Sequence, residues 1–274
     1  MSGPPLLAAR DLVLSFGGNT VLDRVGFEVY EGELLALIGP NGAGKTSTFN
    51  CICGVYRPAS GSLTLRGESL LGLRPDRIAA RGVARTFQNI ELFEGLTVLE
   101  NLLLGRHQGI HAPWWAAMAW LPMASRAEYA ARRRVEDIVD FLDLAAVRRM
   151  PVGVLPYGVK KRVELGRALA MDPDLLLLDE PVAGMNAEET EDMARFILDI
   201  RTELAVSIVM VEHDMRLVMD LADRVMVVDF GRRIALDTPE RVQRDPAVIA
   251  AYLGGASADV VADVTGPADP TVPR

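Results

Sequence analysis

The sequence LLALIGPNGAGKTS, residues 34–47, carries the strongest structural signal in the chain. Its first five residues are apolar, which is typical of a central strand buried on both faces of a sheet. The following residues fit the phosphate-loop pattern G-x-x-x-x-G-K-[ST]. They are Gly39, Pro40, Asn41, Gly42, Ala43, Gly44, Lys45 and Thr46. A predicted strand precedes the loop and a predicted helix follows it, which is the context that this motif requires.

Each part of the loop has a chemical role toward a nucleotide. The glycines let backbone N–H groups turn toward phosphate oxygens, and the N-terminus of the following helix adds partial positive charge. Lys45 is expected to reach the β- and γ-phosphates, and the Thr46 hydroxyl to ligate Mg²⁺. Ser47, the next residue, completes the predicted ATP-binding set.

A second apolar run ends in two carboxylates. Four leucines, residues 175–178, precede Asp179 and Glu180. In open α/β sheets ligands bind at the carboxyl ends of strands, so this pair is predicted to face the nucleotide. Asp179 suits the Mg²⁺ shell. Glu180, expected to point the other way on the strand, would orient or deprotonate the attacking water, a role that contributes about 10²–10⁴-fold to a rate.

The rest of the chain alternates between strand and helix patterns, which indicates an α/β fold with a parallel sheet. The predicted strands are 12–16, 25–29, 62–66, 207–211 and 224–228, and the predicted helices 187–202 and 215–221. A helical block, residues 99–154, interrupts this alternation, and 126–144 is its clearest helix. Beyond Gly254 the sequence has no periodicity, and residues 255–274 are predicted to form a disordered tail.

Composition excludes several classes of function. The chain has 274 residues and a formal net charge of −8, which argues against non-specific nucleic-acid binding. Cys51 and Cys53 fall in a predicted helix, where residues two apart do not share a face, so no disulfide or metal pair is expected. We expect no secretory signal, and no run reaches the ~18 apolar residues that span a bilayer. Work at a membrane would require docking to an embedded partner.

Over residues 6–254 these motifs resemble the nucleotide-binding subunits of ABC transporters. The resemblance implies an α/β phosphate-loop NTPase core with an N-terminal antiparallel β-subdomain. It also implies an inserted α-helical subdomain, at about residues 89–160.

The resemblance assigns roles to further residues. Phe16 corresponds to an aromatic residue that stacks on adenine, although a core phenylalanine is an alternative. Gln88, in the run RTFQ, corresponds to a glutamine that senses Mg²⁺ and the transmembrane partner. His213 corresponds to a histidine that contacts the γ-phosphate. Residues 183–186 correspond to a loop at the dimer interface, with Asn186 where aspartate is commoner.

The family signature, usually LSGGQ, reads LPYGV at residues 155–159. The resemblance implies that Tyr157 and Gly158 cap the ATP held by the opposite subunit of a head-to-tail dimer. Pro156 removes the serine hydroxyl, but proline is tolerated just before a helix.

Lys160 and Lys161 follow in the first turn, where cations oppose the helix dipole, so a nearby anion is expected. Two readings stay open. The lysines could offset the lost hydroxyl in the ATP-bound dimer, or they could form an exposed basic turn.

The variant signature, the insertion at residues 107–125 and the C-terminal run resemble the ATPases of bacterial branched-chain amino acid importers. That subgroup implies two membrane permeases, an extracytoplasmic binding protein and a second ATPase subunit, at the cytoplasmic face of the plasma membrane. Importers of urea or other amides are an alternative. The insertion contains Trp114, Trp115 and Trp120, expected to pack the subdomain or face a permease, or else to lie at a membrane surface.

Other classes of ABC protein share some of these motifs. A DNA-maintenance ATPase would need long coiled coils between the phosphate loop and the signature, and no sustained heptads occur here. A catalytically weak regulatory subunit is suggested by Pro156 and Asn186. Glu180 and His213 argue against that reading, because both catalytic positions are filled.

Overall fold

The phosphate-loop strand, β3 (Leu34–Ile38), lies between two parallel neighbours, β8 (Ser207–Val211) and β9 (Arg224–Asp229). Every residue of β3 and β8 is buried, as their apolar runs predict. The last strand, β10 (Arg232–Asp237), pairs antiparallel with β9 and was not predicted, because its charged residues hide the alternation. The carboxyl ends of β3 and β8 therefore meet at one edge.

The computed structural model describes residues 3–88, 90–106 and 122–253. The described chain divides into two units, the first made of Met1–Arg74 with Ser207–Arg274 and the second of Pro75–Val206. Residues 107–121 of the tryptophan-containing insertion and the predicted tail at 255–274 lie outside the described residues.

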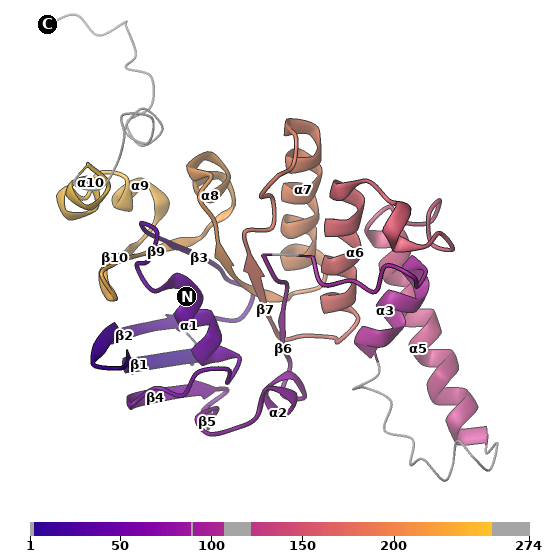
Figure 1. The fold of residues 1–274 in the computed structure, drawn as a ribbon, viewed down its shortest axis with the longest axis horizontal. Coiled ribbons are helices and arrows are strands. Elements are labelled where there is room, and N and C mark those ends of the chain that lie inside the picture. Colours follow the sequence, from indigo (N-terminus) through magenta and orange to yellow (C-terminus); the bar gives the residue numbers. More distant parts are fainter. Residues whose placement is uncertain (1–2, 89, 107–121, 254–274) are drawn as a thin grey trace, which may run out of the picture. The chain divides into compact units, whose positions relative to one another are not determined.

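The first unit also contains an antiparallel sheet of order β2-β1-β4-β5 (Figure 1), which confirms the predicted N-terminal β-subdomain. Its strands are β1 (Leu7–Phe16), β2 (Asn19–Val29), β4 (Ser60–Leu65) and β5 (Glu68–Ser69). β1 begins five residues before the predicted strand. The prediction missed this part because Asp11, at φ 49°, interrupts the register between β1 and β2. Such a bulge breaks the alternation from which a strand is recognised.

Over the residues described for the first unit, four helices complete it. They are α1 (Lys45–Ile52), α8 (Met215–Leu221), α9 (Pro239–Val242) and α10 (Pro246–Leu253). The predicted bounds of α8 are confirmed. Cys51 lies within α1 and Cys53 at its C-terminal cap, and both are free thiols.

The second unit contains a parallel strand pair and a long helix. β6 (Val83–Arg85) pairs with β7 (Leu175–Asp179), and α7 (Ala187–Glu203) follows β7. A short helix, α2 (Pro75–Ala79), precedes β6. β7 and α7 confirm the prediction, whereas β6 was missed because three residues are too few to show a period.

The remaining helices of this unit pack together. α3 (Val98–Arg106) contacts both α5 (Pro122–Phe141) and α6 (Tyr157–Leu169), as Figure 1 shows. A 3₁₀ turn, η2 (Val152–Val154), precedes α6. α5 ends three residues before the predicted end, because Asp143 has a left-handed φ of 54°. The predicted subdomain at about 89–160 stays a prediction. None of the helices that the structure describes is long and apolar enough to cross a membrane.

Candidate active site

The phosphate loop joins β3 to α1 in a conformation that requires glycine. Gly39 has a φ of 151°, and a Cβ there would lie 2.0 Å from the Val228 carbonyl oxygen. Gly44, the N-cap of α1, has a φ of 107°, and its Cβ would meet Leu22 at 2.8 Å. The sequence motif is therefore explained by backbone conformation and by close packing against neighbouring strands.

Lys45 closes the loop on itself. Its Nζ donates to the carbonyl oxygens of Gly39, at 2.6 Å, and Pro40, at 3.0 Å. The lysine is buried, whereas Thr46 at the next position is exposed. This donor set, a cation and a hydroxyl at a helix N-terminus, fits a phosphate group with its metal.

His213 lies at the same sheet edge as the loop, because it follows β8 and β8 is parallel to β3. Its side chain is exposed, and its backbone N–H donates to Glu212 Oε2 at 3.0 Å. Asp214 then caps α8 by accepting from the N–H groups of Arg216 and Leu217. A strand end and a helix cap thus hold the histidine from both sides.

Phe16 is exposed to 48%, which is incompatible with the alternative of a core phenylalanine. Its ring meets Tyr56 edge to face, with centroids 5.0 Å apart. Tyr56, in the turn after α1, was not predicted as a site residue. The two rings offer an aromatic surface suited to a flat base.

In the second unit, the carboxylate of Asp179 forms a buried ion pair. Its Oδ2 accepts from Arg85 Nη2 at 2.7 Å, and both side chains are at most 10% exposed. The Asp179 backbone N–H also donates to Thr86 Oγ1 at 3.4 Å. Arg85 was not predicted as a site residue. It reaches Asp179 because β6 and β7 run side by side and end at the same edge.

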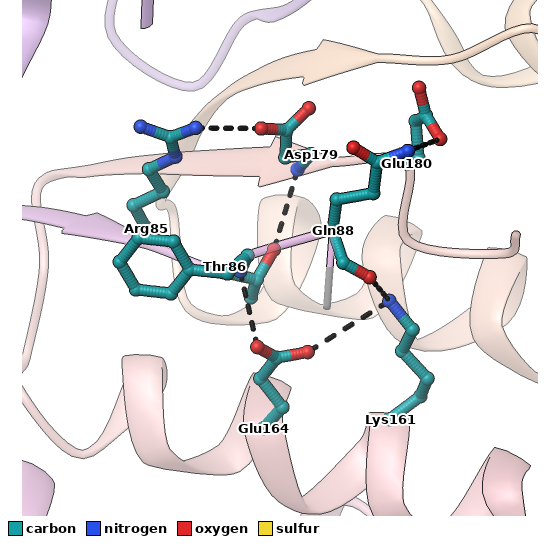
Figure 2. Close-up of polar contacts among 8 residues, drawn as sticks. Arg85, Thr86, Gln88, Lys161, Glu164, Asp179 and Glu180 are labelled. Atoms are coloured by element: carbon teal, nitrogen blue, oxygen red, sulfur yellow. Dashed lines mark hydrogen bonds and ion pairs between the residues drawn. The ribbon is translucent and has the colours of Figure 1, made fainter. Parts of the chain in front are cut away.

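Glu180 differs from its prediction in backbone conformation. It follows the strand with a left-handed φ of 50°, so a turn rather than strand alternation sets its direction. Its Oε2 accepts from Gln88 Nε2 at 2.8 Å (Figure 2). The structure therefore brings together two residues that the sequence singled out separately.

The signature segment packs against the chain that follows Glu180. α6 begins at Tyr157 with Pro156 as its N-cap, which confirms that the proline precedes the helix. The Tyr157 hydroxyl donates to the Ala183 carbonyl at 3.1 Å, and burial raises the pKa of this tyrosine. A Cβ at Gly158 would lie 2.3 Å from Glu189 Oε1, so a larger residue here would displace the Glu189 side chain.

Lys161 does not form an exposed basic turn, and the role of the two lysines in an ATP-bound dimer stays a prediction. The Lys161 side chain is 3% exposed, and its Nζ donates to the Gln88 carbonyl oxygen at 3.1 Å. The expected anion is Glu164, whose Oε2 lies 4.0 Å from that Nζ. Lys160 is also largely covered, and it donates to the Gly153 carbonyl at 3.2 Å. The lysines are therefore anchored within their own subunit.

Comparison with known proteins identifies the family. The ABC transporter family matches residues 22–183, and the branched-chain amino acid ATP-binding cassette transporter family matches 232–258. The chain belongs to the ABC transporter family. It is an ATP-hydrolysing subunit of that family, and the resemblance inferred from its sequence motifs is confirmed.

Two relatives of this ABC ATPase are named high-affinity branched-chain amino acid transport ATP-binding proteins. LivG of Salmonella typhimurium is 41% identical and BraF of Pseudomonas aeruginosa 39%, each over 92% of this chain and 99% of the relative. Among solved structures, the ADP conformation of MJ1267, an ATP-binding cassette of an ABC transporter, matches with a TM-score of 0.80. It is 29% identical, over 92% of this chain and all of that one.

Asn186, where many ABC proteins carry aspartate, has a structural role in this chain. It is the N-cap of α7 and forms a capping box with Glu189. The Asn186 side chain accepts from the Glu189 N–H at 3.0 Å, and the Glu189 carboxylate accepts from the Asn186 N–H at 3.1 Å. An amide satisfies the cap as well as a carboxylate does, so this departure leaves the helix start intact.

Proposed function

We propose that this ABC ATPase powers the import of branched-chain amino acids. Its LivG and BraF relatives carry that function in their names, and this chain covers 99% of each. The branched-chain amino acid cassette family also matches its C-terminal segment, residues 232–258. The substrate would be handled by other subunits, so this chain would supply only the work of ATP hydrolysis.

Within the chain, we assign hydrolysis to Glu180. The observation that carries this assignment is the 2.8 Å hydrogen bond from Gln88 Nε2 to Glu180 Oε2, which leaves the carboxylate oriented at the end of a buried strand. A carboxylate held in this way can orient a water molecule or take its proton. Phe16 and residues 39–47 would bind the ATP, and His213 would contact its γ-phosphate.

Mg²⁺ would accompany ATP and neutralise charge on its phosphates. We assign Thr46, Gln88 and Asp179 to the metal. Their hydroxyl, amide and carboxylate oxygens are the hard donors that Mg²⁺ prefers. The buried ion pair with Arg85 fixes the direction of the Asp179 carboxylate.

The partners follow from the same proposal. Tyr157 and Gly158 would cap ATP on a second ATPase subunit in a head-to-tail dimer, since both lie at the N-terminus of α6. The dimer would dock to two permease subunits at the cytoplasmic face of a bacterial plasma membrane. An extracytoplasmic binding protein would deliver the substrate to the permeases.

ATP hydrolysis by the purified chain tests the catalytic assignment. Glu180→Gln should lower kcat by about 10²–10⁴-fold while ATP still binds, because only the base is lost. Glu203→Gln is the matched control, since Glu203 is an exposed glutamate at the end of α7. Equal kcat in the Glu180→Gln variant and the wild type would refute the role of Glu180.

Transport assays test the substrate. The chain would be co-purified with its permeases, reconstituted and supplied with labelled leucine or labelled urea. The proposal expects ATP-dependent uptake of leucine that is lost in the Glu180→Gln complex. Uptake of urea without leucine would instead favour the amide importer.

A further inference from the structure

Three side chains on one face of α6 hold the segment that carries Gln88. They lie at positions 161, 164 and 167, a spacing that places them on one side of a helix. Lys161 Nζ donates to the Gln88 carbonyl oxygen at 3.1 Å, and Glu164 Oε1 accepts from the Phe87 N–H at 3.1 Å. Arg167 Nη1 donates to the Glu91 carbonyl oxygen.

The first two of these side chains are almost fully buried. Lys161 is 3% exposed and Glu164 is 2% exposed. Burying a lysine and a glutamate is unfavourable unless each has a charged or hydrogen-bonding partner, and apolar residues would fill such a site more cheaply. Burial raises the pKa of Glu164, and the Phe87 N–H and the Lys161 charge counteract that rise. The pair therefore needs an explanation other than stability.

All three contacts are made to backbone atoms. The described residues from 86 to 93 belong to neither helix nor strand. Side chains of α6 therefore supply the hydrogen-bond partners that this backbone would otherwise find within a helix or a sheet. The Gln88 side chain, in contrast, is exposed and reaches Glu180 on another segment (Figure 2). The backbone of this segment is thus fixed from one side while its functional amide acts on the other.

The first turn of α6 also contacts the segment beyond Glu180. Tyr157 donates through its hydroxyl to the Ala183 carbonyl, and the Lys161 Nζ lies 6.0 Å from the centre of the Tyr157 ring. One helical turn therefore touches both the Gln88 segment and the chain that follows the catalytic carboxylate.

We propose that Lys161 and Glu164 are positioning residues that hold Gln88 against Glu180, and that they link the signature turn of α6 to this chain's own catalytic pair. The inference rests on the proposed function, in which the signature turn meets the partner's ATP. Binding of the partner's ATP to that turn would then change the positions of Gln88 and Glu180 in the same subunit. Spatial proximity alone does not establish such coupling, so it must be measured.

A double-mutant cycle in the full-length chain measures the coupling between Lys161 and Gln88. Lys161→Met removes the donor to the Gln88 carbonyl and should lower kcat about 10–100-fold, since a displaced catalytic group loses rate steeply. The KM for ATP should change less than kcat, because Phe16 and the phosphate loop, the main residues assigned to ATP binding, are untouched. Lys161→Arg, which retains a donor, should recover most of the kcat. Arg162→Met, one position along the same helix, is the control and should behave as wild type.

Coupling to Gln88 gives the decisive comparison. If Lys161 acts through Gln88, the Gln88→Ala and Lys161→Met double variant should be no slower than Gln88→Ala alone. Losses that multiply in the double variant, or a wild-type kcat for Lys161→Met, would overturn the inference. Should Lys161→Met fail to fold, Lys161→Gln, a polar side chain of shorter reach, enters the same cycle with the same criteria.

Failure of the inference is distinguishable from failure of the proposed function. A Glu180→Gln variant as active as wild type would remove the assigned chemistry. An inactive Glu180→Gln variant together with a fully active Lys161→Met variant would leave the chemistry standing and reject the positioning role.

Discussion

Replacing Gly231 with alanine tests whether the turn between β9 and β10 supports the phosphate loop. Gly231 has a left-handed φ of 74°, and its N–H donates to the Ala43 carbonyl at 3.0 Å. Its own carbonyl accepts from the Asp23 N–H at 2.8 Å. A Cβ at this position would lie 2.3 Å from the Val21 carbonyl oxygen, closer than real Cβ contacts come.

The expected loss of stability has two parts. Placing an alanine in the left-handed region costs about 1–2 kcal/mol. Relieving the contact with Val21 requires the turn to move, which would weaken hydrogen bonds worth about 0.5–1.5 kcal/mol each to Ala43 and Asp23. The free energy of unfolding should therefore fall by about 2–5 kcal/mol, and the melting temperature by about 2–4 °C for each kcal/mol.

Gly67→Ala is the matched control. Gly67 has a φ of 79°, and a Cβ there would meet nothing within 4 Å, so this variant carries the left-handed cost alone. Thermal unfolding and titration with a fluorescent ATP analogue would be compared for both variants. Gly231→Ala should melt lower than Gly67→Ala and should bind the nucleotide more weakly. Equal melting temperatures, or an unchanged nucleotide affinity for Gly231→Ala, would refute the reasoning.

Three further predictions concern Arg85, Cys51 and Asn186. Arg85→Met should lower the free energy of unfolding in urea by about 3–5 kcal/mol, because it leaves the buried carboxylate of Asp179 without its cation, and Arg85→Lys should lower it less. Burial raises the pKa of Cys51 to about 11, so only about a thousandth of this thiol is ionised at pH 8. Mass spectrometry after alkylation should find Cys51 unmodified in the folded chain and modified in urea, and equal labelling in both would contradict this. Asn186→Ala should cost about 1 kcal/mol through loss of the helix cap, whereas Asn186→Asp should be as stable as wild type when both are measured by thermal unfolding.

The sequence by itself determined the features whose causes are local. β3 and β8 were predicted residue for residue, because each is an apolar run set between turns. The phosphate loop was predicted because its glycines and Lys45 must occur at fixed spacing for backbone N–H groups to surround a phosphate. Glu180 was predicted from the apolar run that it follows. Gln88 and His213 were singled out by their order along the chain, which a resemblance can supply without any geometry.

Only the tertiary structure determined which of these residues meet. The Arg85–Asp179 pair spans 94 residues, and the Lys161–Gln88 contact spans 73. The helix and strand periodicity of the sequence does not indicate such partners. They are determined by the pairing of β6 with β7 and by which face of α6 is buried. A lysine in a first helical turn is ordinarily a solvated cation. Here the fold buries Lys161 beside Glu164, and the buried ammonium group anchors the backbone of the segment that carries Gln88.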